Sequence, residues 1–456
     1  MTTIVDPVTP PGDAAPPGSP EAAAVAATRR RAKLASFVGT SIEWYDYYLY
    51  GTSAALVFNK LFFPEFSALT GTLLALLTFS AGFIARPLGG IVMGHFGDRI
   101  GRKAMLVTSL LVMGVATTLI GVLPTYDAIG LWAPLLLLLM RIAQGFGVGG
   151  EWGGAVLLAV EHAPAHRRGV FGAWPQVGVP VGLLLSNGIF ITLTVTTSSE
   201  AFLAWGWRLC FLLSAPLVLF GLLIRLRIEE TPDFQAVKDA GRVHKVPLLV
   251  VLRRQWQEVL LAIGIRLAQN AIFYIITVFA LTYASTVLDV PKSIVLGGVL
   301  IGAGVSLVNL LFVSWLSDEY GRRRVYLAGA IGWALFAFPF FWLLDTKTTV
   351  LMWLAFVVGL ALHDTMYGPQ AAYFSELFDA DVRYTGASLG YQVASLIAGA
   401  VSPVVAVLLL DVADNKPWPV ALYVVGLSLI TVVATALAPE THRGNRHRPQ
   451  EVARGR

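Results

Sequence analysis

The stretch Gly94–Lys103, which reads GHFGDRIGRK, gives the first clue to the architecture of this chain. It is a short charged turn between two long apolar runs, and its pattern returns at Ser314–Arg323 as SWLSDEYGRR. A single shift along the chain aligns three residues of the two copies: Asp98 with Asp318, Gly101 with Gly321, and Arg102 with Arg322. One such turn is equally typical of a basic loop beside a membrane. Two copies in register, each two apolar runs into its half, predict a duplicated helical bundle.

The composition indicates an integral membrane protein. Of the 456 residues, 56% are hydrophobic and 13% are charged, and the mean hydropathy is +0.69, whereas soluble domains carry roughly 25% charged residues. The net charge of +5 could attract nucleic acid, but the basic residues gather in the polar gaps between apolar runs. We therefore expect a lipid bilayer as partner, and no nucleic acid. The single cysteine, Cys210, excludes an intrachain disulfide.

A spanning helix needs ~20 mostly apolar residues, and the chain contains twelve such runs. They lie at 34–58, 70–94, 104–123, 131–156, 169–194, 206–226, 258–286, 294–316, 325–344, 349–372, 384–410 and 418–438. We predict an all-α membrane protein of twelve transmembrane helices in two pseudo-symmetric six-helix bundles, 33–226 and 258–440. The remaining parts are a disordered basic N-terminal tail at 1–32, a cytoplasmic linker at 227–257 and a basic C-terminal tail at 441–456.

The distribution of positive charge predicts the orientation. If both termini are cytoplasmic, most of the 33 lysine and arginine residues fall in cytoplasmic segments. The external loops then hold a short list of basic residues: Lys60, Lys292, Lys347 and Lys416. This bias follows the positive-inside rule, so we expect a multi-pass protein of the cell (inner or plasma) membrane.

The first and fourth runs carry ionisable residues at membrane depth, where each costs at least ~2.5–3.5 kcal/mol. Glu43, Asp46, Tyr47 and Tyr50 share one helical face, which we expect to line a cavity; salt bridges to other helices are the alternative. Arg141 needs a carboxylate partner, which Asp46 or Glu43 could supply. An acid that loses this partner to an anionic substrate would take up a proton. We predict Asp46 as proton carrier, Glu43 as its rival, and Arg141 as the partner.

Further polar side chains within the runs are candidates to bind a small solute, although a structural role is the alternative for each. Together with Tyr47 and Tyr50 they are Gln144, Glu151, Gln176, Arg266, Asn270, Tyr274, His363, Tyr391 and Gln392. Arg266 could meet a substrate carboxylate. His363 lies beside Asp364. Because histidine is the residue type suited to exchanging protons at physiological pH, His363 is a second candidate for a proton relay; a packing histidine is the alternative.

Several motifs resemble those of the major facilitator superfamily and, within it, of the metabolite:proton symporters. The turn at Gly94–Lys103 is similar to the superfamily signature. The closer resemblance rests on SIEWYD at 41–46, ARPLGG at 85–90, RIAQGF at 141–146, GGEWGG at 149–154 and ETPDF at 230–234. YGPQ at 367–370 and RYTGAS at 383–388 resemble the shikimate-type branch of a group that also carries 2-oxoglutarate, citrate, and proline with betaine.

The resemblance implies alternating access driven by the proton gradient, and it supports Asp46 and Arg141 as the coupling residues. It also implies a cytoplasmic gate. Its expected residues are Gly94, Asp98, Arg99, Gly101, Arg102, Arg168, Asp318, Gly321 and Arg322. Asp98 could face the positive N-terminus of a neighbouring helix and pair with Arg102 or Arg168. Serines replace glycines in the second copy, so we expect a weaker second latch.

The leading hypothesis is a monomeric proton symporter for a small organic acid, without cofactor or metal. A symporter for a zwitterionic osmolyte such as proline or betaine is the alternative, and a drug-efflux antiporter is a weaker one. A channel would need a ring of repeated filter residues. A membrane enzyme would need a clustered site, but the chain contains no P-loop lysine, no HExxH and no cysteine cluster, so we do not expect an enzyme.

Overall fold

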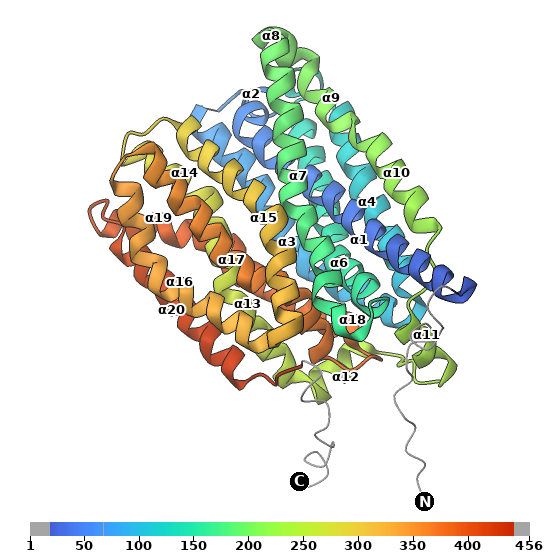
Figure 1. Ribbon diagram of the computed structural model, residues 1–456. Coiled ribbons are helices and arrows are strands. Elements are labelled where there is room, and N and C mark those ends of the chain that lie inside the picture. The colour runs from blue at the N-terminus through green and yellow to red at the C-terminus, as the bar shows by residue number, and fades with distance from the viewer. Residues whose placement is uncertain (1–18, 67, 442–456) are drawn as a thin grey trace, which may run out of the picture.

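The computed structural model describes residues 19–66 and 68–441, and these contain helices and no strands. Two helical bundles stand side by side (Figure 1). The first consists of α1 (Pro20–Ser53), η1 (Ala54–Phe58), α2 (Asn59–Leu61), α3 (Ala68–Ile100), α4 (Arg102–Val122), α5 (Tyr126–Ile129), α6 (Trp132–Glu161), η2 (Ala165–Arg167), α7 (Arg168–Thr196), α8 (Ser199–Ala201), η3 (Phe202–Gly206), α9 (Trp207–Leu212) and α10 (Ser214–Leu226).

The second bundle follows a linker that contains two short helices, α11 (Pro232–Asp239) and α12 (Pro247–Arg254). It consists of α13 (Trp256–Tyr274), η4 (Ile275–Phe279), α14 (Ala280–Thr286), α15 (Lys292–Tyr320), α16 (Arg322–Asp345), α17 (Thr349–Leu377), α18 (Arg383–Ala394), η5 (Ser395–Ala400), α19 (Ser402–Val412) and α20 (Trp418–Leu437). Ten of the described helical stretches are long and apolar enough to cross a membrane. With α1 and α3, which carry the remaining predicted runs, they form the expected twelve-helix plan.

The first helix begins earlier than the sequence predicts. We expected residues 1–32 to be a disordered tail, but α1 already starts at Pro20. The Ser19 hydroxyl accepts a hydrogen bond from the Ala22 amide at 3.1 Å, proline occupies the first helical position, and an alanine-rich run follows, all of which favour a helix. Residues 1–18 and most of the expected C-terminal tail, 442–456, lie outside the described residues.

Short π-helical turns interrupt several of the long helices. η1 and η4 interrupt the first helix of each bundle, at equivalent places in the two repeats, while η3 and η5 lie in the sixth and eleventh helices. A π turn inserts one residue into the helix and re-aims the side chains around it, and such turns are frequent at functional sites. The sequence patterns did not predict them.

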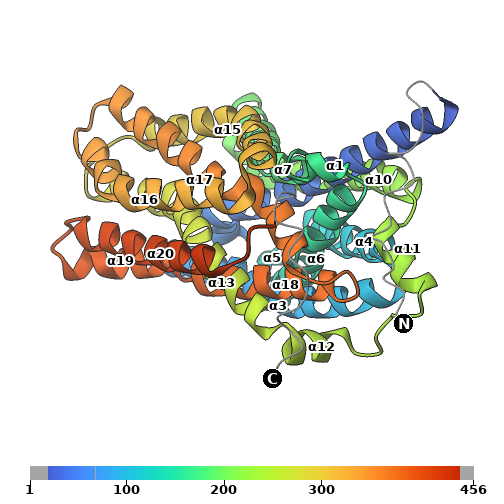
Figure 2. The ribbon, with the colours of Figure 1, turned by 60° about the horizontal axis from the view of Figure 1, so that its bottom comes forward.

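The two bundles meet along two seams. α18 of the second bundle packs on α3 and α6 of the first, and α7 of the first packs on α15 and α17 of the second (Figure 2). Small residues allow the close approach: a Cβ atom on Gly94 of α3 would lie 2.9 Å from the Cα of Thr385 in α18. We call the end of the molecule that carries the turns at Gly101 and Gly321, with α11 and α12, the linker face.

Candidate functional site

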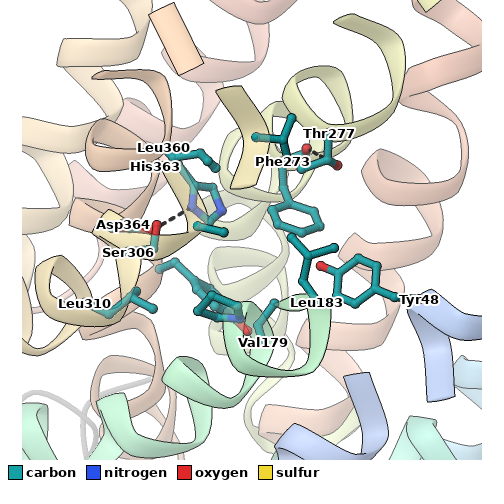
Figure 3. Close-up of a pocket in the computed structure, with 14 residues that line it drawn as sticks. Tyr48, Val179, Leu183, Phe273, Thr277, Ser306, Leu310, Leu360, His363 and Asp364 are labelled. Atoms are coloured by element: carbon teal, nitrogen blue, oxygen red, sulfur yellow. Dashed lines mark hydrogen bonds and ion pairs between the residues drawn. The ribbon is translucent and has the colours of Figure 1, made fainter. Parts of the chain in front are cut away.

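A small cavity lies between the two bundles (Figure 3). Its volume is about 30 Å³, enough for about two water molecules. Its walls come from α1 and α7 of the first bundle and from α13, η4, α15 and α17 of the second: Tyr48, Val179, Pro180, Leu183, Phe273, Thr277, Val299, Ala303, Ser306, Leu310, Leu360, His363, Asp364 and Tyr367. Among the predicted solute ligands, His363 lines this cavity directly. An organic solute would need the bundles to separate before it could enter.

Asp46 is buried inside the first bundle, with 1% of its surface exposed. Its two carboxylate oxygens accept hydrogen bonds from the hydroxyls of Ser214, at 2.5 Å, and Thr117, at 2.9 Å. The direct ion pair of Asp46 with Arg141 that we predicted is not formed. Instead, a relay connects them: Gln144 donates to the Thr117 hydroxyl at 2.7 Å and accepts from Arg141 Nη1 at 3.2 Å. The two hydroxyls replace the guanidinium because they reach the carboxylate from neighbouring helices.

Glu43 is buried as deeply, but one of its carboxylate oxygens has no hydrogen-bond partner. Its charged neighbours are Glu151, Arg86, Arg225 and Asp46. A buried carboxylate with an unoccupied oxygen is costly because burial penalises its charge. Glu43 therefore differs from Asp46, whose oxygens are both occupied.

Arg86 of α3 was not among the predicted site residues. Its guanidinium is buried and lies 4.7 Å from the ring centroids of both Tyr47 and Phe83, and it makes no ion pair among the described contacts. Glu43 and Tyr274 belong to its electrostatic surroundings. The sequence did contain a signal for Arg86, because a charged residue stands there within an apolar run and belongs to the ARPLGG motif.

The tyrosines predicted on α1 have different surroundings. The hydroxyl of Tyr47 lies 3.3 Å from that of Tyr274, so the pair bridges the two bundles. Tyr50 points into the first bundle, where its hydroxyl lies 2.8 Å from the hydroxyl of Thr78 and its ring faces Arg141 at 4.4 Å. The predicted polar face of α1 is therefore divided between the bundle interface and the interior of the first bundle.

Arg266 of α13 is a buried guanidinium surrounded by neutral groups. Its Nη1 donates to Gln370 at 2.7 Å and to Gln269 at 2.9 Å, and its Nη2 donates to Asn270 at 3.3 Å. The guanidinium carbon lies 3.2 Å from the ring centroid of Tyr391. Arg266 has no carboxylate partner among the described residues. Asn270 and Tyr391, two other predicted ligands, lie in contact with it.

Other predicted ligands hold the bundles together on the linker side of the cavity. Gln176 accepts from the Trp152 indole at 3.0 Å and donates to the carbonyl of Tyr367 at 3.0 Å. The Trp152 ring stacks on Tyr391 with centroids 3.7 Å apart. Gln392 donates to a backbone carbonyl of α6, that of Gly149, at 2.9 Å. These contacts close the interface below the cavity.

Glu151, a predicted solute ligand, is instead part of a buried ion pair within the first bundle. Its two oxygens pair with the guanidinium of Arg225, and one of them also accepts from the Ser109 hydroxyl at 3.0 Å. Both charged side chains are 2% exposed. The sequence did not reveal this ion pair because Arg225, near the end of α10, reaches back into the bundle instead of extending to the linker, and solute binding by Glu151 stays a prediction.

The linker face carries a quasi-symmetric pair of helix caps between the bundles. Asp98 of α3 accepts from the backbone amides of Tyr384 and Thr385, at 3.2 and 2.9 Å, and from the Thr385 hydroxyl at 2.8 Å. Asp318 of α15 accepts from the amides of Gly169 and Val170, at 2.8 and 2.9 Å. Each aspartate thus occupies the positive N-terminus of a helix in the other bundle, as predicted for Asp98.

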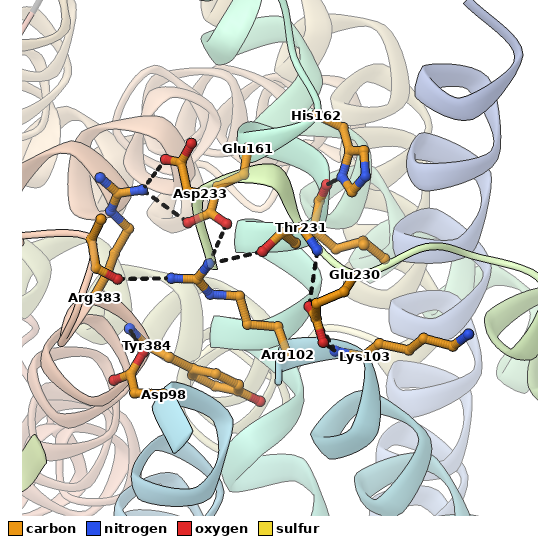
Figure 4. Close-up of polar contacts among 12 residues, drawn as sticks. Asp98, Arg102, Lys103, Glu161, His162, Glu230, Thr231, Asp233, Arg383 and Tyr384 are labelled. Atoms are coloured by element: carbon orange, nitrogen blue, oxygen red, sulfur yellow. Dashed lines mark hydrogen bonds and ion pairs between the residues drawn. The ribbon is translucent and has the colours of Figure 1, made fainter. Parts of the chain in front are cut away.

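The arginines of the two turns pair with glutamates and not with Asp98. Arg102 Nη1 lies 2.5 Å from Glu161, and Arg102 also bonds to Thr231 and to the carbonyl of Ala380, at 2.8 and 3.1 Å (Figure 4). Arg322 contacts Asp318 at 2.7 Å and Glu376 at 3.4 Å. Arg322 also donates to the Ser317 hydroxyl at 2.9 Å, so one of the serines that replace glycine takes part in the second latch; that this latch is weaker stays a prediction.

The glycines of the turns also have a structural reason. Gly101 and Gly321 have φ values of 127° and 103°, which glycine tolerates and other residues adopt with strain. Glu230 accepts from the Lys103 amide at 3.2 Å, and Glu440 accepts from the Arg322 amide at 2.9 Å. Glu230 and Glu440, which follow the sixth and twelfth helices, therefore cap α4 and α16. Arg99 is outside this network: it is exposed and contacts His95.

Arg383 joins the linker to both bundles. Its Nη1 contacts Glu161 at 2.8 Å and Asp233 of α11 at 2.6 Å. Burial by itself would raise the pKa of Asp233, but the positive charges of Arg383, Arg168 and Arg102 outweigh it, so the pKa of this carboxyl lies below its usual value. Asp233 is therefore ionised at neutral pH and holds α11 against the turn.

Comparisons with known proteins agree with this arrangement. Residues 36–402 match the sequence model of the Major Facilitator Superfamily, and a second match covers 303–455. The Shikimate transporter of Escherichia coli (strain K12) is 43% identical over 420 residues, which cover 91% of this chain and 95% of that protein. The Proline/betaine transporter of the same strain is 32% identical over 425 residues, covering 90% and 84%. A structure of the proton:xylose symporter XylE bound to 6-bromo-6-deoxy-D-glucose shares the fold, with a TM-score of 0.75, 17% identity, and coverage of 91% and 97%.

Proposed function

The chain belongs to the major facilitator superfamily, and on this basis we propose that it is a proton-coupled symporter that imports a small organic acid by alternating access. It is a multi-pass membrane protein. We place its linker face and both termini in the cytoplasm of a cell-membrane protein, because the basic residues gather at that face. The chain works as a monomer and carries its solute without changing it.

The observation that carries the proposal is the lack of a negatively charged partner for Arg266 among the residues that the structure describes. A guanidinium buried without a counter-ion is costly, yet the described residues around Arg266 offer it only amide and hydroxyl partners and an aromatic ring. A carboxylate solute that enters between the bundles would supply the missing negative charge. Arg86 is a second buried guanidinium of this kind, on the side of the first bundle.

A zwitterionic osmolyte remains the second candidate, and the aromatic residues around the cavity favour it. Trp44 and Tyr48 lie 5.4 Å apart by ring centroids, and Phe273 lies 6.1 Å from Trp44. Aromatic faces attract quaternary ammonium groups, so such a solute would place its carboxylate at Arg266 and its ammonium among these rings. A drug-efflux antiporter has no comparable observation in its favour.

The closed linker face supplies the gate of the proposed cycle. The caps formed by Asp98 and Asp318 hold α18 and α7 of the opposite bundles, so the cytoplasmic gate must break both caps to open. Arg102 and Arg322 support the caps through Glu161 and Glu376. The near-symmetry of the two caps suits a rocking motion of one bundle against the other.

Asp46 is the proposed proton carrier, with Glu43 as rival. Asp46 is linked to Arg141 through Thr117 and Gln144, so a movement of Arg141 reaches the acid through one side-chain amide and one hydroxyl. Glu43 is the rival because one of its buried carboxylate oxygens has no hydrogen-bond partner. Either acid would carry its proton at membrane depth and release it when the gate opens to the cytoplasm.

The test measures proton movement with solute. Right-side-out vesicles that contain the purified protein are given shikimate, and the external pH is recorded in weak buffer. Uptake of shikimate with alkalinisation of the medium supports the proposal, whereas accumulation without proton movement contradicts coupling. Betaine in place of shikimate separates the two candidates.

A further inference from the structure

A chain of four polar side chains connects the solute site to the cavity. Arg266 donates from Nη1 to the side-chain oxygen of Gln269 at 2.9 Å. A guanidinium has donors and no acceptor, so the amide oxygen of Gln269 must face Arg266 and its NH₂ group must face the other way. That NH₂ group lies 2.7 Å from Nε2 of His363. Arg266 thereby determines how Gln269 is oriented.

The orientation of Gln269 determines the protonation of His363. Because the amide NH₂ donates, Nε2 of His363 must accept, so it carries no proton. The ring proton then lies on Nδ1, which is 3.3 Å from Oδ1 of Asp364. Asp364 also accepts from the side-chain amide of Asn309 at 3.1 Å. His363 is therefore neutral in this arrangement and donates to Asp364.

The remaining surroundings of His363 are neutral. The residues that face it or its partner Asp364 are Tyr48, Phe273 and Ser306 from the packed helices and Tyr367 from α17 itself. Figure 3 shows the His363 ring directed between Asp364 and the ring of Phe273. Among the described residues around the ring, the charged groups are Asp364 and, through Gln269, Arg266. The orientation of the Gln269 amide therefore decides whether Nε2 of His363 faces a hydrogen-bond donor or an acceptor.

A proton on Nε2 of His363 would point at the NH₂ group of Gln269, donor against donor. Turning the amide over would offer its oxygen to the protonated ring, but the NH₂ group would then point at the guanidinium of Arg266. A carboxylate bound at Arg266 removes this conflict, since it can accept from Arg266 and from the turned NH₂ group together. In that state the Gln269 oxygen accepts from the Nε2–H of His363.

We propose that Gln269 is a positioning residue that couples the binding of an organic anion at Arg266 to the uptake of a proton by His363. One N–H bond forms at Nε2 and one O–H bond breaks in a hydronium ion of the solvent, which is left as water; no other covalent bond changes. The proposal rests on the proposed function, because it assumes an anionic solute at Arg266. It goes further by assigning a second proton site, in the second bundle, and the residue that links this site to the solute.

The test follows the His363 ring and the protons taken up. The full-length protein in detergent is labelled with ¹⁵N-histidine, and the ring signals of His363 are recorded with and without shikimate, alongside proton uptake in weak buffer. The wild type is expected to have an unprotonated Nε2 without shikimate and a doubly protonated ring with it. Q257M, a glutamine-to-methionine change near the exposed start of the same helix, is the matched control and should behave like the wild type.

Two variants separate the coupling role from a packing role. Q269M keeps the length of the side chain without its hydrogen bonds, so the factor by which shikimate raises the proton affinity of His363 should fall about tenfold, which is ~1.4 kcal/mol of coupling. Q269E has two acceptor oxygens, so the ring of His363 should be doubly protonated without shikimate. An unchanged ring signal in Q269E, or wild-type proton uptake in Q269M, would overturn the proposal.

The failure of the proposed function gives a different result. If shikimate and betaine neither bind to nor are transported by the wild type, the solute assignment is wrong. The ring signals without solute still test the inference, because Nε2 of His363 must be unprotonated in the wild type and protonated in Q269E at the same pH.

Discussion

The cap formed by Asp98 allows the gate to be tested quantitatively by Asp98→Asn. The carboxylate accepts three bonds from the start of α18, whereas an amide keeps one oxygen and turns an NH₂ group toward these donors. Bonds to a charged group contribute ~1.5–3 kcal/mol, against about 1 kcal/mol for neutral ones, and the helix N-terminus adds ~0.3–1 kcal/mol. We take ~2 kcal/mol as the loss, which shifts the ratio of closed to open linker faces about 30-fold.

The assay is a distance measurement across the linker face by double electron–electron resonance. Spin labels are placed on cysteines at Arg99 and Asp379, two exposed positions of α3 and of the segment before α18, after Cys210→Ala removes the native cysteine. Asp98→Asn should move the distance distribution to longer values. Asp239→Asn, an exposed aspartate of α11 that contacts Gln235, is the control. An unchanged distribution in Asp98→Asn would refute the reasoning.

Three further predictions concern the first bundle and the linker helix α11. Glu151→Gln leaves Arg225 buried without its partner, so thermal unfolding should report a loss of ~3–5 kcal/mol, and wild-type stability in this variant would contradict the ion pair. The ionised carboxylate of Asp233 stabilises the closed linker face. Because its pKa lies below the usual value, this stabilisation is complete at any pH above the usual pKa of an aspartate. It is lost only as the pH falls through the lowered pKa. Asp233→Asn should therefore change the closed fraction equally at pH 7.5 and 5.5 by the same spectroscopy, and a difference between them would oppose this. Gly101→Ala forces a positive φ on alanine and brings its Cβ onto Glu230, so it should lower stability by ~1–3 kcal/mol in the same thermal assay. An unchanged melting temperature would count against the strain.

Much of the architecture could be predicted because it depends on local requirements that a sequence displays. Gly101 and Gly321 mark turns of positive φ, and Asp98 precedes the first of them at a helix end, where its side chain can reach another helix. The apolar runs give the helices, and their repetition gives the two bundles. The extension of α1 to Pro20 was missed because the low hydropathy of residues 20–32 outweighed the cap at Ser19.

The site could be predicted only in part because partners across helices leave no local pattern. Asp46 and Arg141 stand out as charges in apolar runs, but the hydroxyls of Ser214 and Thr117 that hold Asp46 are ordinary residues of distant helices. Glu151 stood out in the same way, yet its partner Arg225 lies near the end of a helix and looks like a basic flank. The sequence therefore indicates which charges are buried, and the packing decides which of them pair.

The central claim is that a proton on a buried acid of α1 drives uptake. Its most direct test compares uphill accumulation of shikimate with solute exchange in proteoliposomes, for the wild type, Asp46→Asn and Glu43→Gln. Without an acid that gains and loses a proton, the carrier can still exchange solute but cannot use the proton gradient. The account predicts that Asp46→Asn abolishes accumulation and retains exchange. Full accumulation by Asp46→Asn would contradict the assignment of Asp46, and full accumulation by both variants would contradict the claim itself.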